Sequence, residues 1–128
     1  MLDNTIYNHY TLYMDKIHNT NKGGNTMERK IKYVARAVRW FDKVNGNTYH
    51  SVRITRIDDG VTIGTTDYQY GYDDHYRQTA RALMLKAGWL PEQYNDKNVY
   101  LYERENEYPI EWIVTDGLKR EMIANCVK

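Results

Sequence analysis

Residues 31–57 read IKYVARAVRWFDKVNGNTYHSVRITRI, and this stretch decides the fold. Both halves are rich in β-branched and aromatic residues, which favour extended strands. Between them stands Asn45-Gly46, a pair typical of tight hairpin turns in which both positions need a positive φ. In the second half Val52 and Ile54 alternate with polar residues, so that apolar and polar side chains take opposite sides of the strand. The stretch therefore predicts a β-hairpin with one buried face.

Turn and helix signals continue beyond the hairpin. The Asp58-Asp59-Gly60 sequence predicts a second turn, and VTIGT at 61–65 a short third strand. A helix is predicted over 75–87, with Asp73 or Asp74 as its N-cap and Gly88 at its end. The apolar stripe of this helix is formed by Tyr76, Ala80, Leu83 and Ala87, with Met84 beside them.

The last part of the chain repeats the plan of strands followed by a helix. NVYLYER at 98–104 and EYPIEWIVT at 107–115 are predicted as strands. A closing helix, capped by Thr115 or Asp116, carries Leu118, Met122, Ile123 and Cys126 on its apolar side. The resulting order is β-β-β-α-β-β-α. It predicts an α+β fold, an antiparallel sheet with two helices packed on one face.

The domain is expected to begin at Met27. The codons for residues 22–27 can contain a purine-rich ribosome-binding site followed by a start codon, as in a bacterium or its phage. Residues 1–26 would then be a leader or a dispensable extension, and 27–128 a single α+β domain. The alternative is a flexible Gly-Gly linker that joins a short N-terminal helix to the domain.

Composition narrows the class of protein. The chain has 128 residues, of which 41% are hydrophobic and 27% charged, as in a globular domain. Its 18 Lys and Arg against 17 Asp and Glu argue against non-specific clamping of a phosphate backbone. A single cysteine, Cys126, excludes an internal disulfide and a cysteine metal cluster. There is no apolar run of about 20 residues and no secretory signal at the start, so we expect no membrane contact and a location in the bacterial cytoplasm.

Residues that could support catalysis are explained more simply by structure. His50 and His75 lack the spacing of metal ligands, and we expect His50 to be a half-buried, hydrogen-bonded strand residue and His75 to be solvated. The paired aspartates fit turns and helix capping, and Ser51 has no nucleophile-elbow motif around it. The sequence therefore predicts no catalytic residue, no metal site and no cofactor. We expect a protein that is not an enzyme.

Arginine and tyrosine side chains on the hairpin and the following loop form a candidate binding surface. Guanidinium groups interleaved with aromatic rings can stack bases or clamp phosphates, and both residue types are enriched at protein-binding hot spots. An ordinary solvated sheet face is the equally weighted alternative. The candidate residues are Arg36, Arg39, Tyr49, Arg53, Tyr68, Tyr70 and Tyr72.

The hairpin also carries a resemblance. The pattern WFDK-x-x-GNTYHSV at 40–52, with Tyr70-Gly71-Tyr72 after it, resembles small uncharacterised proteins of phages and mobile elements over roughly residues 31–90. No activity is assigned to that group, so the resemblance implies context only. The β-β-β-α order is also similar to the later part of a double-stranded-RNA-binding domain, but the lysine pair that grips phosphates there is missing here.

The expected function is binding. A small mobile-element protein without a catalytic motif is expected to occupy the surface of a host protein or ribonucleoprotein complex, as anti-CRISPR inhibitors of host defence do. The alternative is an accessory module that binds nucleic acid or nucleotides through the arginine and tyrosine face. A small hydrolase is a third option, for which no constellation is present. Self-association into a homo-oligomer is compatible with each of these.

Overall fold

The computed structural model describes residues 30–95 and 98–127, so the expected leader at 1–26 lies outside the described residues. The fold is α+β, built on a mixed five-stranded sheet. Its elements along the chain are β1 (Tyr33–Asp42), β2 (Asn47–Arg56), β3 (Thr62–Gly64), β4 (Gln69–Tyr70), α2 (His75–Lys86), the 3-10 turn η1 (Glu92–Tyr94), α3 (Leu101–Glu105), β5 (Ile110–Asp116) and α4 (Lys119–Ala124).

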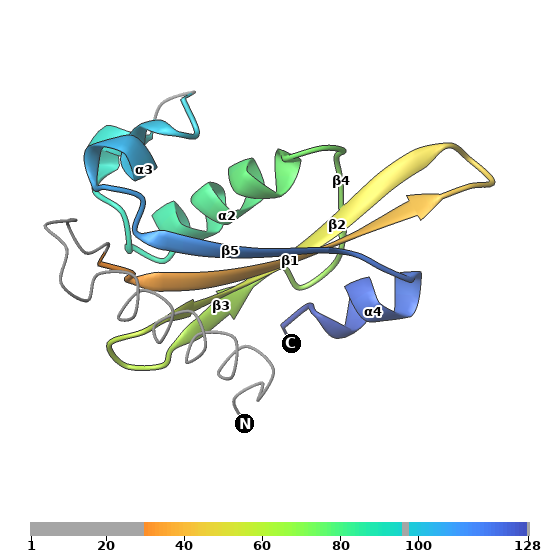
Figure 1. Cartoon of the computed structure of the whole chain (residues 1–128), viewed down its shortest axis with the longest axis horizontal. Helices are drawn as coiled ribbons and strands as arrows, with labels where there is room; N and C mark the ends of the chain where they lie inside the picture. The colour runs from red at the N-terminus through yellow and green to blue at the C-terminus, as the bar shows by residue number, and fades with distance from the viewer. Residues whose placement is uncertain (1–29, 96–97, 128) are drawn as a thin grey trace, which may run out of the picture.

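The sheet is mixed rather than wholly antiparallel. Its order is β3-β2-β1-β5, and β4 pairs with the other end of β2 (Figure 1). β1 and β2 are antiparallel, as the hairpin predicted, but β5 runs parallel to β1. The expected antiparallel sheet is corrected here, because the chain leaves β2, crosses by way of α2 and α3, and returns beside β1. A crossover of this length allows parallel pairing, which a tight turn does not.

The helices lie on both faces of the sheet. On β2, the ring of His50 contacts Thr79 of α2, whereas the hydroxyl of the next residue, Ser51, donates to the carbonyl oxygen of Met122 in α4. Successive side chains of a strand point to opposite faces, so α2 and α4 lie on opposite sides. Figure 1 shows α2 and α4 separated by the strands. The expected packing of two helices on one face is therefore wrong.

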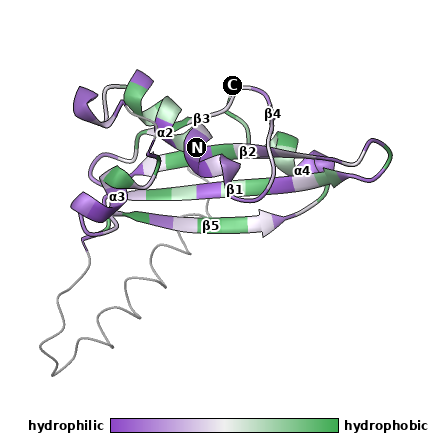
Figure 2. Cartoon of the chain, turned by 90° about the horizontal axis from the view of Figure 1, so that it is seen from above, coloured by the Kyte–Doolittle hydropathy of each residue, from purple (hydrophilic) through white to green (hydrophobic). Residues whose placement is uncertain are grey.

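The larger core lies between α2 and the sheet. Val52 and Ile54 have no exposed surface, as their alternation predicted, and Ala35 and Ala37 of β1 lie beside them, equally buried. Small alanine side chains let a helix approach the sheet closely. The described buried residues that α2 contributes are Tyr76 and Ala80, two members of the expected stripe, and Met84, which was expected beside it. The apolar bands of β1 and β2 are visible in Figure 2.

The segment 98–104 is not a strand. It forms a turn followed by α3, and the backbone N–H of Tyr100 donates to the side-chain oxygen of Asn98 at 3.0 Å, which starts that turn. Short runs of alternating bulky residues fit a helix as well as a strand, and here burial of Tyr102 decides between them. The order predicted for this part of the chain is corrected accordingly.

The hairpin turn also differs in detail. Residues 43–46 form a four-residue loop, in which Gly46 has a φ of 71° and no positive φ occurs at Asn45. The carboxylate of Asp42 accepts hydrogen bonds from the backbone N–H groups of Val44 and Asn45. This cap stabilises the longer loop, so only the glycine needs the left-handed conformation.

Candidate functional site

A concave surface lies where the end of the hairpin meets two other segments. It encloses about 920 Å³ between residues 39–44 of the hairpin, the loop at Tyr72 and Asp73, and the turn from Asp116 to Leu118. We call this the hairpin-end surface. The three segments are distant in sequence, and β1 lies between the other two. Because it joins elements that only the folded sheet brings together, no local motif could have revealed it.

Large apolar side chains are exposed around the hairpin-end surface. Val44 at the tip is 92% exposed, Tyr72 is 65% exposed, Phe41 is 54% exposed and Leu118 is 52% exposed. All four line the same hollow. Exposed apolar groups that gather in one place, with polar residues around them, are typical of protein-binding sites. The grouping, rather than the exposure of any one residue, is the informative feature.

Arg39 connects two of the segments that form the hairpin-end surface. Its Nε donates to Oδ1 of Asp116 at 2.7 Å, and its Nη1 donates to the backbone carbonyl oxygen of Asp73 at 2.9 Å. Asp73 has a φ of 51°, the left-handed conformation that aspartate tolerates better than most residues. Arg39 therefore ties the loop before α2 to the end of β5, and its position on the surface is fixed before any partner arrives.

The charges around the hairpin-end surface are unequal. Arg39 and Lys43 are its two basic residues. Its acidic residues are Asp42, Asp73, Asp116 and Glu121. Hydrogen bonds from Asn45 and from the turn backbone lower the pKa of the Asp42 carboxyl, which keeps it ionised. Carboxylates therefore outnumber basic groups among the residues that line the hairpin-end surface, and we call these four carboxylates its acidic rim.

The predicted tyrosines separate into two groups. Tyr49 stacks on Trp40 with ring centroids 5.8 Å apart and meets Tyr68 and Tyr70 edge-on at 5.4 and 5.8 Å. The ammonium of Lys119 lies 5.3 Å from the centre of the Trp40 ring and covers this cluster. Tyr72 is not part of it and lines the hairpin-end surface instead.

The predicted arginines do not form one surface. Arg39 pairs with His50 in the strand register and lies on the α2 side of the sheet, whereas Arg36 pairs with Arg53 on the α4 side. The guanidinium of Arg53 donates to the backbone carbonyl oxygens of Asn125 and Cys126, at 3.3 and 3.0 Å. Arg53 therefore binds the end of α4. The sequence placed it correctly on the face opposite Val52, but that face is covered as well.

The two histidines of the described chain form a buried contact. His50 has no exposed surface, and its Nδ1–H donates to the Gly71 carbonyl oxygen at 3.2 Å. Its Nε2 then accepts from the Thr79 hydroxyl at 2.7 Å. The expected hydrogen bonding of this strand histidine is confirmed, but the side chain is fully buried and not half-buried. Burial is the main cause that lowers the pKa of His50, and the neighbouring His75 lowers it further.

His75 is not simply solvated. Its ring lies 5.4 Å from that of His50, and its Nδ1 is buried without a hydrogen-bond partner in the described chain. The same ring packs against the backbone of Gly71, where a Cβ atom would lie 2.5 Å from it. The pair therefore fixes the loop that carries Tyr70 and Tyr72.

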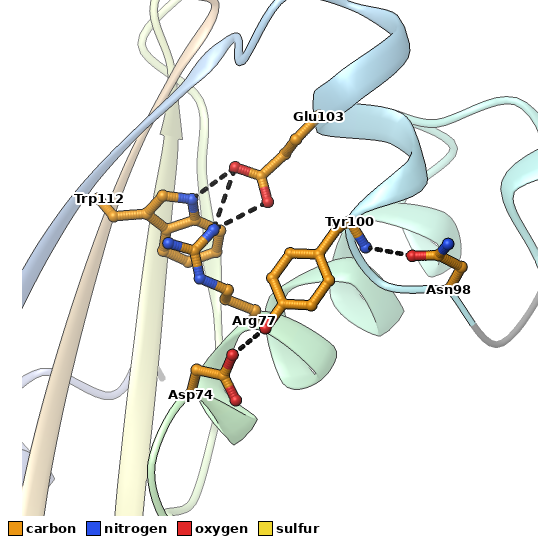
Figure 3. Close-up of polar contacts among 6 residues, drawn as sticks. All are labelled: Asp74, Arg77, Asn98, Tyr100, Glu103 and Trp112. Carbon is orange, nitrogen blue, oxygen red and sulfur yellow. Dashed lines mark hydrogen bonds and ion pairs between the residues drawn. The ribbon is translucent and has the colours of Figure 1, made fainter.

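A second hollow, of about 660 Å³, lies beside the start of β5 and contains a cluster that the sequence did not reveal. Arg77 forms an ion pair with Glu103 at 3.0 Å and stacks on Trp112, whose Nε1 donates to the same carboxylate at 2.8 Å (Figure 3). The Tyr100 hydroxyl donates to the carboxylate of Asp74. The charged and polar groups of this cluster are thus hydrogen-bonded to one another, and the contacts hold α3 against α2. The mistaken strand at 98–104 hid them, because a strand would send Tyr100 and Glu103 to opposite faces.

No model of a known protein family, no curated protein and no solved structure matches this chain. The resemblance of the hairpin to small phage proteins therefore stays an expectation. Within residues 30–95 and 98–127, no three His, Cys, Asp or Glu side chains are grouped so that they could hold a metal ion. In the same part of the chain, no helix is both long and apolar enough to cross a membrane.

Proposed function

We propose that this chain is a non-enzymatic binding protein, and that the hairpin-end surface contacts a partner protein. The observation that carries the proposal is the set of exposed apolar side chains around one hollow, with Phe41, Tyr72 and Leu118 each more than half exposed. Aromatic and aliphatic groups in a concave surface are suitable anchors for another protein. Arg39 adds a guanidinium whose position is already fixed by Asp116.

The partner is expected to present apolar side chains flanked by lysine or arginine. The hairpin-end surface carries four carboxylates against two basic groups, Arg39 and Lys43. An acidic rim attracts a basic partner and disfavours an acidic one, so charge contributes to the choice of partner more than to the strength of binding. This rim also makes a phosphate backbone an unfavourable ligand for this surface.

A host macromolecule is the proposed source of the partner. This part of the proposal rests on the resemblance of the hairpin motif at 40–52 to proteins of phages and mobile elements. Such a protein would act by covering a working surface of a host complex, for instance in a defence system such as CRISPR. The acidic rim would suit a host surface that normally contacts nucleic acid, because that kind of surface is basic.

The test compares two exposed apolar residues on different surfaces. Phe41→Glu places a charge in the hairpin-end surface, and Ile123→Glu does the same on α4, where Ile123 is 48% exposed against 54% for Phe41. Both variants and the parent chain are immobilised and exposed to a lysate of the bacterial host. A defined protein retained by the parent and by Ile123→Glu, and lost by Phe41→Glu, is the expected result. Equal capture by all three would remove the hairpin-end surface from consideration.

Nucleic-acid binding is the second candidate, and the cluster of Trp40, Tyr49, Tyr68 and Tyr70 is the observation that favours it. Stacked aromatic rings beside Lys119 could hold an unpaired base. The support is weaker, because Arg53 is committed to carbonyl oxygens of α4 and Arg39 to Asp116. Titration with single-stranded oligonucleotides at rising salt separates the candidates: binding that falls steeply with salt would favour this one.

A further inference from the structure

Among the residues that the structure describes, the β5 strand forms an open edge of the sheet. It is the last strand in the order β3-β2-β1-β5, and its pairing with β1 continues without a bulge from Ile110 to Asp116. The opposite edge is formed by short pieces, three residues in β3 and two in β4. Short strands are a common protection against pairing with another chain. Of the two edges formed by residues 30–95 and 98–127, the β5 edge is the long one.

The backbone groups that point away from β1 can be identified. The N–H of Gly117 donates to the carbonyl oxygen of Arg39 at 2.8 Å, and the carbonyl oxygen of Pro109 accepts from Lys32. In a parallel ladder every second residue directs both groups to the same neighbour, so the odd-numbered residues of β5 face β1. Trp112, Val114 and Asp116 therefore direct N–H and C=O outward. In the described part of the chain, nothing is bonded to these groups.

Two of the usual guards of an edge strand, lysine and proline, are missing from this one. The sequence of β5, IEWIVTD, contains no lysine, no proline and no glycine. Its middle is apolar, and the Val114 side chain is 37% exposed. An edge with these properties is a template for another strand, and in a natural protein it is expected to be covered.

We propose that β5 pairs with β5 of a second copy of this chain, antiparallel and centred on Val114. In this register Val114 lies opposite its own copy, and Trp112 lies opposite Asp116 of the other copy. These are the residues whose backbone groups point outward, so each opposite pair can exchange both N–H···O bonds. A two-fold axis through the centre makes the contact self-complementary, which is the commonest symmetry of dimers.

Charge supports a second copy as the occupant. Opposite residues of an antiparallel pair point to the same face of the sheet. Glu111 and Asp116, the two acidic residues of β5, point to opposite faces and therefore never stand opposite each other in a self-paired ladder. On the α4 side, Ile113 would lie opposite Thr115. The contact is apolar at its centre, and like charges do not oppose one another at its ends.

This inference does not rest on the proposed function. Asp116 belongs to both the self-paired ladder and the hairpin-end surface, but Phe41, Tyr72 and Leu118, which carry the proposed function, lie outside the ladder. The dimer would be a continuous sheet in which both α2 helices lie on one side and both α4 helices on the other, because a two-fold axis normal to the sheet keeps its faces. Loss of partner capture and loss of dimers are therefore separate results.

The test is the mass of the full chain in solution, measured by sedimentation over a range of concentrations. The parent is expected to be a dimer that dissociates on dilution. Val114→Pro removes an outward N–H without breaking the ladder to β1, and proline is tolerated at such edge positions. Val114→Lys adds a charge that would face its own copy. Val61→Lys is the matched control, since Val61 is 43% exposed at the turn before β3.

Both Val114 variants are expected to shift the dissociation constant at least tenfold toward monomer, while Val61→Lys leaves it unchanged. Thermal melting of each variant, recorded on the same samples, checks that the fold is intact. If Val114→Pro alone fails to fold, Val114→Lys decides the result. A parent chain that is monomeric at every concentration, or a dimer that both Val114 variants leave unchanged, would overturn the proposal.

Discussion

Arg53 and Cys126 are joined by a hydrogen bond from Nη2 to a backbone carbonyl oxygen, 3.0 Å long, across 73 residues of sequence. The same guanidinium also donates to the carbonyl oxygen of Asn125. The last carbonyl groups of a helix have no partners within it, and a cation at this end is favourable. Arg53 thus fastens α4 to the sheet.

Replacement of this arginine should therefore destabilise the fold. We expect Arg53→Met to lower the free energy of unfolding by about 2 kcal/mol, the usual loss for hydrogen bonds to a charged group. Arg104→Met is the control, because Arg104 is exposed on α3. Urea unfolding of the two variants measures the difference. Equal stabilities would mean that Arg53 is an exposed surface residue after all.

Gly71 should tolerate no side chain. Its φ is 153°, and a Cβ atom there would lie 2.5 Å from the ring of His75. We expect Gly71→Ala to cost about 3 kcal/mol, from a strained backbone together with an overpacked contact. Gly46→Ala is the comparison: nothing lies within 4 Å of its Cβ, so the backbone penalty of about 1–2 kcal/mol stands alone. If the loop at Gly71 can move away from His75, chemical denaturation would instead show Gly46→Ala to be the more destabilising of the two substitutions.

Acid should weaken the fold through His50. Burial holds its pKa below the usual 6.5, so between those values the unfolded chain binds more protons than the folded one. Stability from this residue is therefore complete above about pH 6.5 and is lost as the pH falls toward the folded pKa, by at most about 1.4 kcal/mol per pH unit.

The measurement is a series of melting curves between pH 7.5 and 5.5, a range above the titration of ordinary carboxyl groups. His50→Gln should flatten this dependence, even if it lowers stability at every pH, because glutamine does not titrate. A parent and a variant with parallel pH profiles would assign the effect to another group.

Loss of the carboxylate of Glu103 should leave a cation without its partner. The Glu103 side chain is 5% exposed and that of Arg77 is 25% exposed. Removing one member of a buried ion pair costs about 3–5 kcal/mol, and we expect about 2–3 kcal/mol for Glu103→Gln because water reaches Arg77. Glu105→Gln, on the exposed side of α3, is the matched control. If the two glutamine variants melt together, the ion pair contributes nothing.

Local features of the fold could be predicted from the sequence, and distant pairings could not. The strands on both sides of Gly46, the burial of Val52 and Ile54 and the end of α2 at Gly88 depend on neighbouring residues. The parallel pairing of Tyr33 with Ile110 depends on a crossover whose direction no local pattern records. Because the direction of this crossover is not recorded in the sequence, the sheet is predicted to be antiparallel and α4 is predicted on the wrong face.

In the candidate site, too, local features could be predicted from the sequence and contacts between distant segments could not. Alternation placed Arg53 and Val52 on opposite faces, but it cannot show whether a later helix covers the second face. Arg39 and Tyr72 were expected to contribute to binding, and both line the hairpin-end surface. Leu118, predicted on the apolar side of the closing helix, lies instead in the turn after β5 and is 52% exposed, so only the folded sheet brings the three together.

The parallel pairing of β1 with β5 has a consequence for synthesis of the protein. Arg39 and Asp116 are 77 residues apart, so one edge of β1 has no strand beside it until β5 has been made. At about 5–20 residues per second, a ribosome needs roughly 4–15 s to cover that distance. During this interval the nascent hairpin exposes an unpaired edge and, without α4, the buried hydroxyl of Ser51. A chaperone that binds extended apolar segments would therefore find its target in β1, and only before the last quarter of the chain has left the ribosome.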